Sequence, residues 1–314
     1  MKRILITGGS GLLGSNLAKI ATDGWEVYST YWQHPVQLQS VKFVQMDLTN
    51  REEFDKLDSI KPDYIVHAAA LTNIDHCEER PEDAHRQNVL ASVNVAQFAK
   101  KHHAYLAHIS TDAVFDGEKG HYREEDEVHP LSVYAETKLK AEQEVLSIAS
   151  RSCVARTNIF GWNKIHKFSL AEWMLDKLER HQELPGFKDV FFSSILVNAL
   201  ARAVFRLQEV EYQGILHLAG GESCTKLEFA HRLAKIFGLD ERLIKSVSVD
   251  EVSLKARRGK NLSLNVSKAE KILGIRLPGV DEGLKEMKEL RDNRYVESLR
   301  SHETKNYCNH SRPQ

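Results

Sequence analysis

Short apolar runs alternate along the first half of the chain with longer segments whose apolar residues recur every three or four positions. The short runs are typical of buried strands, and the longer period is typical of helices packed on one face. The predicted strands are residues 4–6, 25–30, 41–46, 64–69, 105–109 and 153–156. One predicted helix begins near Leu12, and three others span residues 51–60, 81–102 and 133–148. This alternation predicts an α/β fold, a doubly wound parallel sheet whose right-handed crossovers bring every strand's carboxyl end to one edge.

Beyond residue 157 the alternation of strand-like and helix-like segments becomes less regular, which predicts a smaller, mixed α/β domain that binds the substrate. Its expected elements are helices at 168–180, 197–207 and 226–237, a strand at 215–218, an aromatic patch at 190–192 and a basic loop at 255–260. We place the dinucleotide-binding domain at 1–160, with segments from about 187–219 returning to it, and the substrate domain at 161–290. The polar tail, 291–314, has little to bury, so we expect a frayed helix and then disorder.

The first predicted strand runs into a glycine-rich turn, TGGSGLLG, at residues 7–14. Gly8 would allow the tight turn, Gly11 would let a pyrophosphate approach the backbone, and Gly14 would let the next helix pack closely on the strand. The free N–H groups and positive dipole end of the helix that begins near Leu12 would then face the pyrophosphate. Because the turn follows a strand and opens an amphipathic helix, it indicates a dinucleotide site of the Rossmann type.

Composition narrows the class of protein further. A net charge of −1 and 42% hydrophobic residues are untypical of a nucleic-acid-binding or disordered chain, so phosphate recognition must be local. No apolar stretch approaches the length of a membrane span, and we expect a soluble, cytoplasmic protein. The four cysteines lack CxxC spacing, and the histidines are scattered, so we expect reduced, mostly buried thiols and no metal site.

The candidate chemistry lies near the start of the predicted helix 133–148. Tyr134 and Lys138 are four residues apart and so share one face of that helix, and Thr111 lies at the carboxyl end of the preceding strand. A lysine ammonium close to a phenol favours the phenolate, so we expect Lys138 to lower the pKa of Tyr134. Tyr134 would then serve as general acid to a carbonyl oxygen, to which the Thr111 hydroxyl would also donate.

These motifs resemble the extended short-chain dehydrogenase/reductase superfamily, and within it most resemble the dTDP-4-dehydrorhamnose reductase family of NDP-sugar 4-keto reductases. The resemblance extends to about residue 290. It is carried by TGGSGLLG, HAAALTNIDHCEERPEDAHRQNV (67–89), HISTDAVFDG (108–117), YREEDEVHPLSVYAETKLKAE (122–142) and RTNIFG (156–161). It implies NAD(P)H-dependent reduction of the 4-keto group of a nucleotide-activated deoxysugar, with Thr111, Tyr134 and Lys138 catalytic.

The resemblance and the turn together give a set of expected contacts. The expected cofactor contacts are Gly8, Ser10, Gly11, Leu12, Leu13, Gly14, Asp47, Leu48, Ala68, Ala69, Ala70, Tyr134 and Lys138. The expected substrate contacts are Thr72, Thr111, Asp112, Phe192, Arg257 and Arg258, the two arginines clamping a diphosphate together with Lys260. Structural roles remain as alternatives. Asp47 could cap a turn, Ala68–Ala70 could be small only for packing, and Asn88 could only hold the backbone. The basic loop could simply be an exposed loop.

Two departures from family patterns affect the choice of ligands. NAD enzymes usually carry an acidic residue after the second strand to bind the ribose 2′-hydroxyl, but residues 29–34 here read STYWQH. This favours NADP, with NAD still possible and His34 or Arg3 as candidate partners of the 2′-phosphate. The segment 189–194 lacks the glycine and proline that the family carries there, which leaves the identity of the sugar open.

Two other functions remain compatible with the sequence. A sugar-nucleotide dehydratase or epimerase would share the motifs, but related dehydratases carry Asp-Glu after the threonine, and here Asp112 is followed by Ala113. A non-catalytic NADP-binding subunit is the second alternative, because the methionine adenosyltransferase beta subunit resembles this chain, including its tyrosine–lysine pair. We expect the protein to bind a nucleotide sugar and neither nucleic acid nor a membrane. A homodimer is left open.

Overall fold

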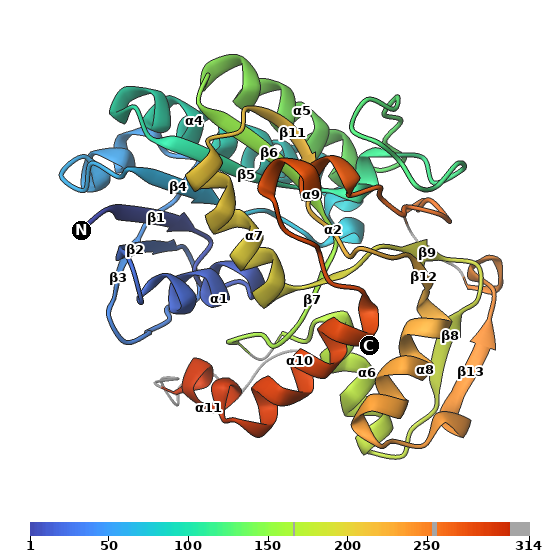
Figure 1. Cartoon of the computed structure of the whole chain (residues 1–314). Helices are drawn as coiled ribbons and strands as arrows, with labels where there is room; N and C mark the ends of the chain where they lie inside the picture. Colours follow the sequence, from blue (N-terminus) through green and yellow to red (C-terminus); the bar gives the residue numbers. More distant parts are fainter. Residues whose placement is uncertain (166, 253–255, 302–314) are drawn as a thin grey trace.

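A parallel sheet of seven strands forms the centre of the computed structural model, which describes residues 1–165, 167–252 and 256–301 (Figure 1). The strand order is β11-β6-β5-β4-β1-β2-β3, and every neighbouring pair is parallel. The strands are β1 (Arg3–Thr7), β2 (Glu26–Tyr31), β3 (Val41–Gln45), β4 (Tyr64–His67), β5 (Tyr105–Thr111), β6 (Ser152–Thr157) and β11 (Gly214–His217). The chain order reverses between β1 and β4, so the doubly wound Rossmann fold predicted from the sequence is confirmed.

The alternation of side chains along β1 explains why both faces of the sheet are covered. Ile4 and Ile6 are buried in one apolar cluster with residues of α1 (Leu12–Ala21) and α7 (Val197–Val210). Leu5 is buried in a second cluster with residues of α4 (Ala91–His102) and α5 (Val133–Ile148). A fully buried parallel strand therefore reads as a continuous apolar run, as the sequence of β1 does.

The helix predicted at 81–102 is a rod of three parts, α3 (Pro81–Ala84), a π-helical segment η2 (His85–Leu90) and α4. Within the π segment, the Asn88 side chain accepts from the Leu71 N–H at 2.8 Å and donates to the Thr137 hydroxyl at 3.0 Å. Asn88 thus holds the backbone after β4, the structural role left open above. The helix predicted at 51–60 is a 3-10 helix, η1 (Arg51–Leu57).

The remaining elements form the less regular part of the chain on the carboxyl side of the sheet (Figure 1). Three short strand pairs occur there: β7 (Ile159–Phe160) with β10 (Ile195–Leu196), β8 (Leu184–Phe187) with β13 (Ile244–Val247), and β9 (Phe191–Phe192) with β12 (Cys224–Thr225). The helices are α2 (Ile74–Glu79), α6 (Leu170–Glu179), α8 (Lys226–Phe237), α9 (Ser267–Leu273), α10 (Val280–Asp292) and α11 (Tyr295–Arg300), with single 3-10 turns η3 (Asp112–Val114), η4 (Glu241–Leu243) and η5 (Val249–Glu251).

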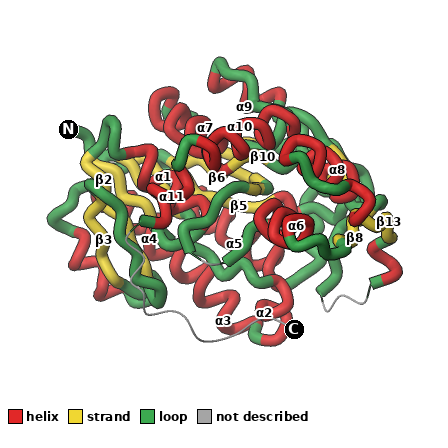
Figure 2. Tube along the Cα trace, turned by 90° about the horizontal axis from the view of Figure 1, so that it is seen from below, coloured by secondary structure: helices red, strands yellow, loops and turns green. Residues whose placement is uncertain are grey.

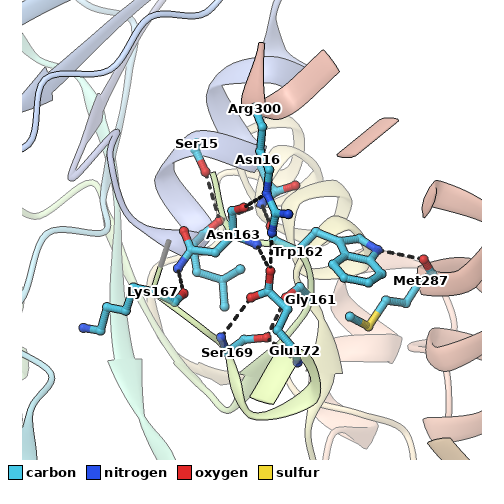
Figure 3. A network of polar contacts seen from close by, with 11 residues as sticks. Ser15, Asn16, Gly161, Trp162, Asn163, Lys167, Ser169, Glu172, Met287 and Arg300 are labelled. Atoms are coloured by element: carbon cyan, nitrogen blue, oxygen red, sulfur yellow. Dashed lines mark hydrogen bonds and ion pairs between the residues drawn. The ribbon is translucent and has the colours of Figure 1, made fainter. Parts of the chain in front are cut away.

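The expectation of a frayed helix after residue 291 is wrong, because α11 is packed against the rest of the chain. Leu299 is buried, and the Tyr295 hydroxyl donates to the Asn16 side chain of α1 at 2.9 Å; Figure 2 shows the two helices side by side. Arg300 donates to the Asn163 carbonyl and to the buried Glu172 carboxylate, at 3.0 and 2.7 Å. Figure 3 shows this polar network, which joins α1, α6 and α11 around Trp162, Asn163 and Ser169.

Three cysteines, Cys77, Cys153 and Cys224, are free and buried; Cys308, Lys255 and the expected disordered segment 302–314 lie outside the described residues. Within the described ranges, no three His, Cys, Asp or Glu side chains gather as a metal site would require. Among the same residues, no helix is both long enough and apolar enough to cross a membrane.

Candidate active site

A cavity of about 1110 Å³ lies along the carboxyl ends of the central strands. Apart from Arg3 and Lys260, the site residues expected from the sequence line it, contributed by the glycine turn, the ends of β3, β4 and β5, the first two turns of α5, strand β9 and the segment after η5. They are Gly8, Ser10, Gly11, Leu12, Leu13, Gly14, Asp47, Leu48, Ala68, Ala69, Ala70, Thr72, Thr111, Asp112, Tyr134, Lys138, Phe192, Arg257 and Arg258. The structure therefore brings these residues to one place, while their individual roles remain predictions.

The glycine turn is shaped by contacts that a side chain would prevent. Gly8 has φ +73°, and a Cβ there would lie 2.8 Å from the Ala69 backbone. A Cβ on Gly14 would lie 2.2 Å from the Gly8 carbonyl oxygen, so only glycine lets α1 start this close to the turn. The Ala69 N–H in turn donates to the Thr7 hydroxyl at 3.2 Å, which places the ends of β1 and β4 side by side.

The residues around this turn fit a dinucleotide. Helix α1 has Gly11 as its N-cap, with no side chain capping the first turn and no acidic residue in it. Such an end presents unpaired N–H groups and a positive dipole to an anion. The Asp47 carboxylate accepts from the Thr49 N–H at 2.9 Å and also lines the cavity, so it caps a turn on the cavity wall.

The segment after β2 lines the same cavity. Trp32, Gln33 and His34 all contribute to its wall, and none of them is acidic. Arg3, the other candidate for a 2′-phosphate, is not on that wall: its guanidinium donates to the Ile60 carbonyl at 2.8 Å and lies 3.4 Å from Glu26. The expectation for Arg3 is therefore wrong, because β1 directs its side chain to the opposite end of the sheet.

Helix α5 begins in a way that fixes Tyr134 in the cavity. The Ser132 hydroxyl caps the helix by accepting from the Ala135 N–H, and the Glu78 carboxylate accepts from the Val133 N–H at 2.8 Å. Tyr134 follows in the first turn and lies close enough to Thr111 for a side-chain hydrogen bond to lower its pKa. One turn later, Lys138 is buried and donates to the Ile109 carbonyl at 2.7 Å.

The pKa of Tyr134 differs from the sequence-based expectation. Burial is the largest effect and raises the pKa of the phenol to about 12, against the smaller lowering by Thr111, and the Asp112 carboxylate raises it further. Burial lowers the pKa of the Lys138 ammonium to about 8, although the Glu142 carboxylate acts in the other direction. No hydrogen bond joins Tyr134 to Lys138, because the lysine is held by β5, so its predicted acidifying effect is absent from this geometry.

A buried charge pair lies behind Lys138. Arg156 of β6 donates to the Glu142 carboxylate at 2.8 Å, and the Ser110 hydroxyl donates to the same carboxylate at 2.5 Å. Both charged side chains are almost inaccessible to solvent. A buried pair of this kind is stable only while both partners remain, so it ties the end of β5 to α5 and β6.

Asp112 is bonded to a neighbour that sequence reasoning missed. Its carboxylate accepts from Thr111 at 3.1 Å and from the Asn158 amide at 2.9 Å. Burial raises the pKa of Asp112 to about 6, while those two bonds and the charge of Lys226 lower it. Asn158 and Lys226 both line the cavity; Asn158 lies in the RTNIFG motif, but nothing in the sequence assigns either residue a role, since they approach Asp112 only through the fold.

The far end of the cavity is aromatic and basic. Phe192 is buried, Phe187 and Phe191 lie near it on the wall, and Arg257 and Arg258 are exposed at the rim. One Arg258 nitrogen lies 3.4 Å from the Asp75 carboxylate of α2. Arg258 therefore bridges the two sides of the cavity mouth, whereas Lys260 is paired outside it with Asp250.

The parallel sheet and the glycine turn define a nicotinamide-dependent oxidoreductase of the short-chain type, in which a threonine, a tyrosine and a lysine lie beside the dinucleotide cleft. The family model described as "RmlD substrate binding domain" matches residues 1–292. This chain therefore belongs to that family, the dTDP-4-dehydrorhamnose reductases of the extended short-chain dehydrogenase/reductases.

Individual relatives include both reductases and a subunit of another enzyme. A dTDP-4-dehydrorhamnose reductase of Aggregatibacter actinomycetemcomitans is 29% identical, with 92% of this chain and 99% of the relative covered. The methionine adenosyltransferase 2 subunit beta of Rattus norvegicus is 32% identical over 90% of this chain and 87% of its own length. The crystal structure of a hypothetical dTDP-4-dehydrorhamnose reductase from Sulfolobus tokodaii is 34% identical, with a TM-score of 0.78 and coverage of 88% and 96%.

Proposed function

We propose that this protein is a reductase that uses NADPH to reduce the 4-keto group of a nucleotide-activated deoxysugar, with dTDP-4-dehydrorhamnose as the reference substrate. One observation carries the proposal: Thr111, Tyr134 and Lys138 lie on the wall of the same cavity as the glycine turn. Relatives with reductase names cover 92% and 88% of this chain, which supports the same function.

In carbonyl reduction, Tyr134 and Thr111 would have different roles. When bound, NADPH supplies the hydride that adds to the carbonyl carbon. Tyr134 donates its phenolic proton to the carbonyl oxygen, so that the C=O group becomes a CH–OH group. The Thr111 hydroxyl donates a hydrogen bond to the same oxygen and stabilises the negative charge that develops there.

A high pKa suits Tyr134 to this role. At neutral pH a phenol with a pKa of about 12 is fully protonated and therefore ready to donate. Lys138, with a pKa of about 8, is still largely an ammonium group at pH 7 and can hold ribose hydroxyls beside the phenol.

The preference for NADPH follows from the segment after β2. No acidic side chain occurs in residues 29–34 to accept a hydrogen bond from a ribose 2′-hydroxyl, and His34 lies on the wall where a 2′-phosphate would be bound. Calorimetric titration with both dinucleotides measures this. NADH binding tenfold tighter than NADPH, about 1.4 kcal/mol, would contradict the preference.

Absorbance at 340 nm, followed with NADPH and dTDP-4-dehydrorhamnose, tests the activity. We expect loss of absorbance that depends on the keto sugar and gives the 4-hydroxy sugar nucleotide as product. The dTDP-linked 4-hydroxy sugar is the control, and it should give no change. Tight NADPH binding with no oxidation by any keto sugar nucleotide would instead support a binding subunit, the reading suggested by the beta-subunit relatives.

The expected diphosphate contacts and the assembly state need separate measurements. If Arg257 and Arg258 clamp the diphosphate, their joint replacement by alanine should weaken nucleotide-sugar binding, and unchanged affinity would mark the loop as surface. A homodimer remains a proposal that light scattering tests. A dehydratase is less well supported, because Asp112 is the single carboxylate at the end of β5, and Ala113 follows it.

A further inference from the structure

Lys226 occupies a fixed position on the cavity wall between the reaction centre and the basic rim. It is the first residue of α8, whose N-cap, Thr225, forms a capping box with Glu228. Its own N–H donates to the Val190 carbonyl at 3.0 Å, next to the antiparallel pair of β12 with β9. A helix start and a strand pair therefore hold its Cα in place, so the side chain enters the cavity from one direction.

The Lys226 ammonium has no partner among the described residues that would account for its position. Among those residues neither a hydrogen-bond acceptor nor an ion-pair partner contacts it, and its nitrogen lies over the Phe187 ring, 5.7 Å from the ring centre. Lys138, also on this wall, donates directly to a backbone carbonyl. A partly buried cation without an acceptor is costly unless a ligand supplies the negative charge.

The surroundings of Lys226 indicate which part of a ligand it would meet. Burial lowers the pKa of its ammonium, the positive charge of Arg258 lowers it further, and the carboxylate of Asp112 raises it, so both groups lie near. Asp112 adjoins Thr111 and thus the reacting carbonyl, whereas Arg258 lies at the mouth. In a hexose ring, C4 and the anomeric C1 lie on opposite sides, so with C4 at Tyr134 the phosphate on C1 points toward the rim.

Resting on the function proposed above, we propose that Lys226 binds the sugar-linked phosphate of the nucleotide substrate and so selects phosphate-linked sugars over free ones. The competing explanation is that Lys226 is only a counter-charge for Asp112. The oxygens of Asp112 already accept from Thr111 and Asn158, and no ion pair with Lys226 forms between these described residues. The geometry thus leaves the ammonium available to an anion in the cavity.

Calorimetric titration with dTDP tests Lys226 without requiring turnover. Removing one charge-assisted contact should weaken dTDP binding about ten- to a hundredfold in Lys226→Met, and Lys226→Arg should retain part of the affinity. Lys235→Met is the matched control, because Lys235 is an exposed residue on the last turn of the same helix, and its variant should bind like wild type. Thymidine, which lacks phosphates, should bind equally to all forms.

Kinetics with the keto sugar nucleotide separate the two explanations. We expect Lys226→Met to raise KM with little change in kcat, since a phosphate contact is equally strong in the ground and transition states. Unchanged dTDP affinity in a folded Lys226→Met protein would overturn the proposal. A shifted pH profile of kcat with unchanged KM would also overturn it, because that result would identify Lys226 as a counter-charge to Asp112. Wild type that binds no dTDP would also refute it. Failure of the proposed function would give a different result: wild type would bind dTDP but would not oxidise NADPH in the 340 nm assay.

Discussion

Replacing Tyr134 by phenylalanine removes one hydroxyl group and leaves the ring in the first turn of α5. With a pKa of about 12, roughly one phenol in 10⁵ is ionised at pH 7, so in the proposed reaction Tyr134 would start as a proton donor and not as a base. Loss of a general acid typically slows the chemical step by about two to four orders of magnitude, or about 3–5 kcal/mol. We expect kcat for the keto sugar nucleotide to fall by that amount.

The structure limits the other effects of this change. The phenol interacts with Thr111 at the cavity, and losing one such hydrogen bond costs about 1 kcal/mol of folding stability. The glycine turn and the amides of α1 are untouched, so NADPH affinity should change less than threefold. A large loss of kcat with intact cofactor binding is therefore the expected signature of an acid, and a loss of both would indicate a distorted site.

Stopped-flow absorbance at 340 nm measures the chemical step, and calorimetry measures the affinity for NADPH. Tyr28→Phe is a suitable control, because its phenol donates to Glu26 at 2.8 Å and does not line the cavity. That variant should turn over like wild type. A Tyr134→Phe protein that retains more than a tenth of wild-type kcat would refute the assignment of Tyr134 as the acid.

Three further outcomes follow from the geometry. Because burial lowers the pKa of Lys138 to about 8, its ammonium is present below that pH and lost above it, so kcat/KM should fall as pH rises from 8 to 10; a flat profile would contradict this. Gly14→Ala would bring a Cβ within 2.2 Å of the Gly8 carbonyl and should weaken NADPH binding at least tenfold by calorimetry, whereas Gly24→Ala, with open space around it, should not. Arg300→Ala removes a 2.7 Å bond from buried Glu172 and should lower the free energy of unfolding in urea by about 1–3 kcal/mol; equal stability would show that α11 adds nothing.

Local patterns sufficed wherever neighbouring residues build the structure together. The turn at 7–14 and the pair Tyr134–Lys138 could be predicted because their spacing fixes their geometry within a strand, a turn or a helix. The π-helical segment at 85–90 could not, and neither could the bond by which its Asn88 reaches the backbone after β4, since residues far apart in sequence meet there. The packing of α11 was missed for a similar reason: its polar sequence predicted a frayed helix, whereas it contacts α1 and α6.

Electrostatic effects were the least predictable from sequence, because they depend on burial. Spacing alone places a lysine near Tyr134 and so predicts a lowered pKa, but it says nothing of how far each group is removed from water. In the structure, desolvation dominates both groups and moves the pKa of the phenol up and that of the ammonium down. Asn158 and Lys226 were missed because they meet Asp112 only when separate parts of the chain fold together.

Catalysis and mere binding make different demands on this cavity. Any chain that binds a dinucleotide through this turn needs the close approach at Gly8 and Gly14, so this feature is expected in reductases and in binding subunits alike. A binding chain has no need to bury Lys138 and Asp112, whose perturbed pKa values reflect a free-energy cost of desolvation. Side chains with such shifts gather where chemistry is done, which favours the reductase. Tyr134→Phe decides between the two, because the hydroxyl contributes to turnover in a reductase and to nothing measurable in a binding subunit.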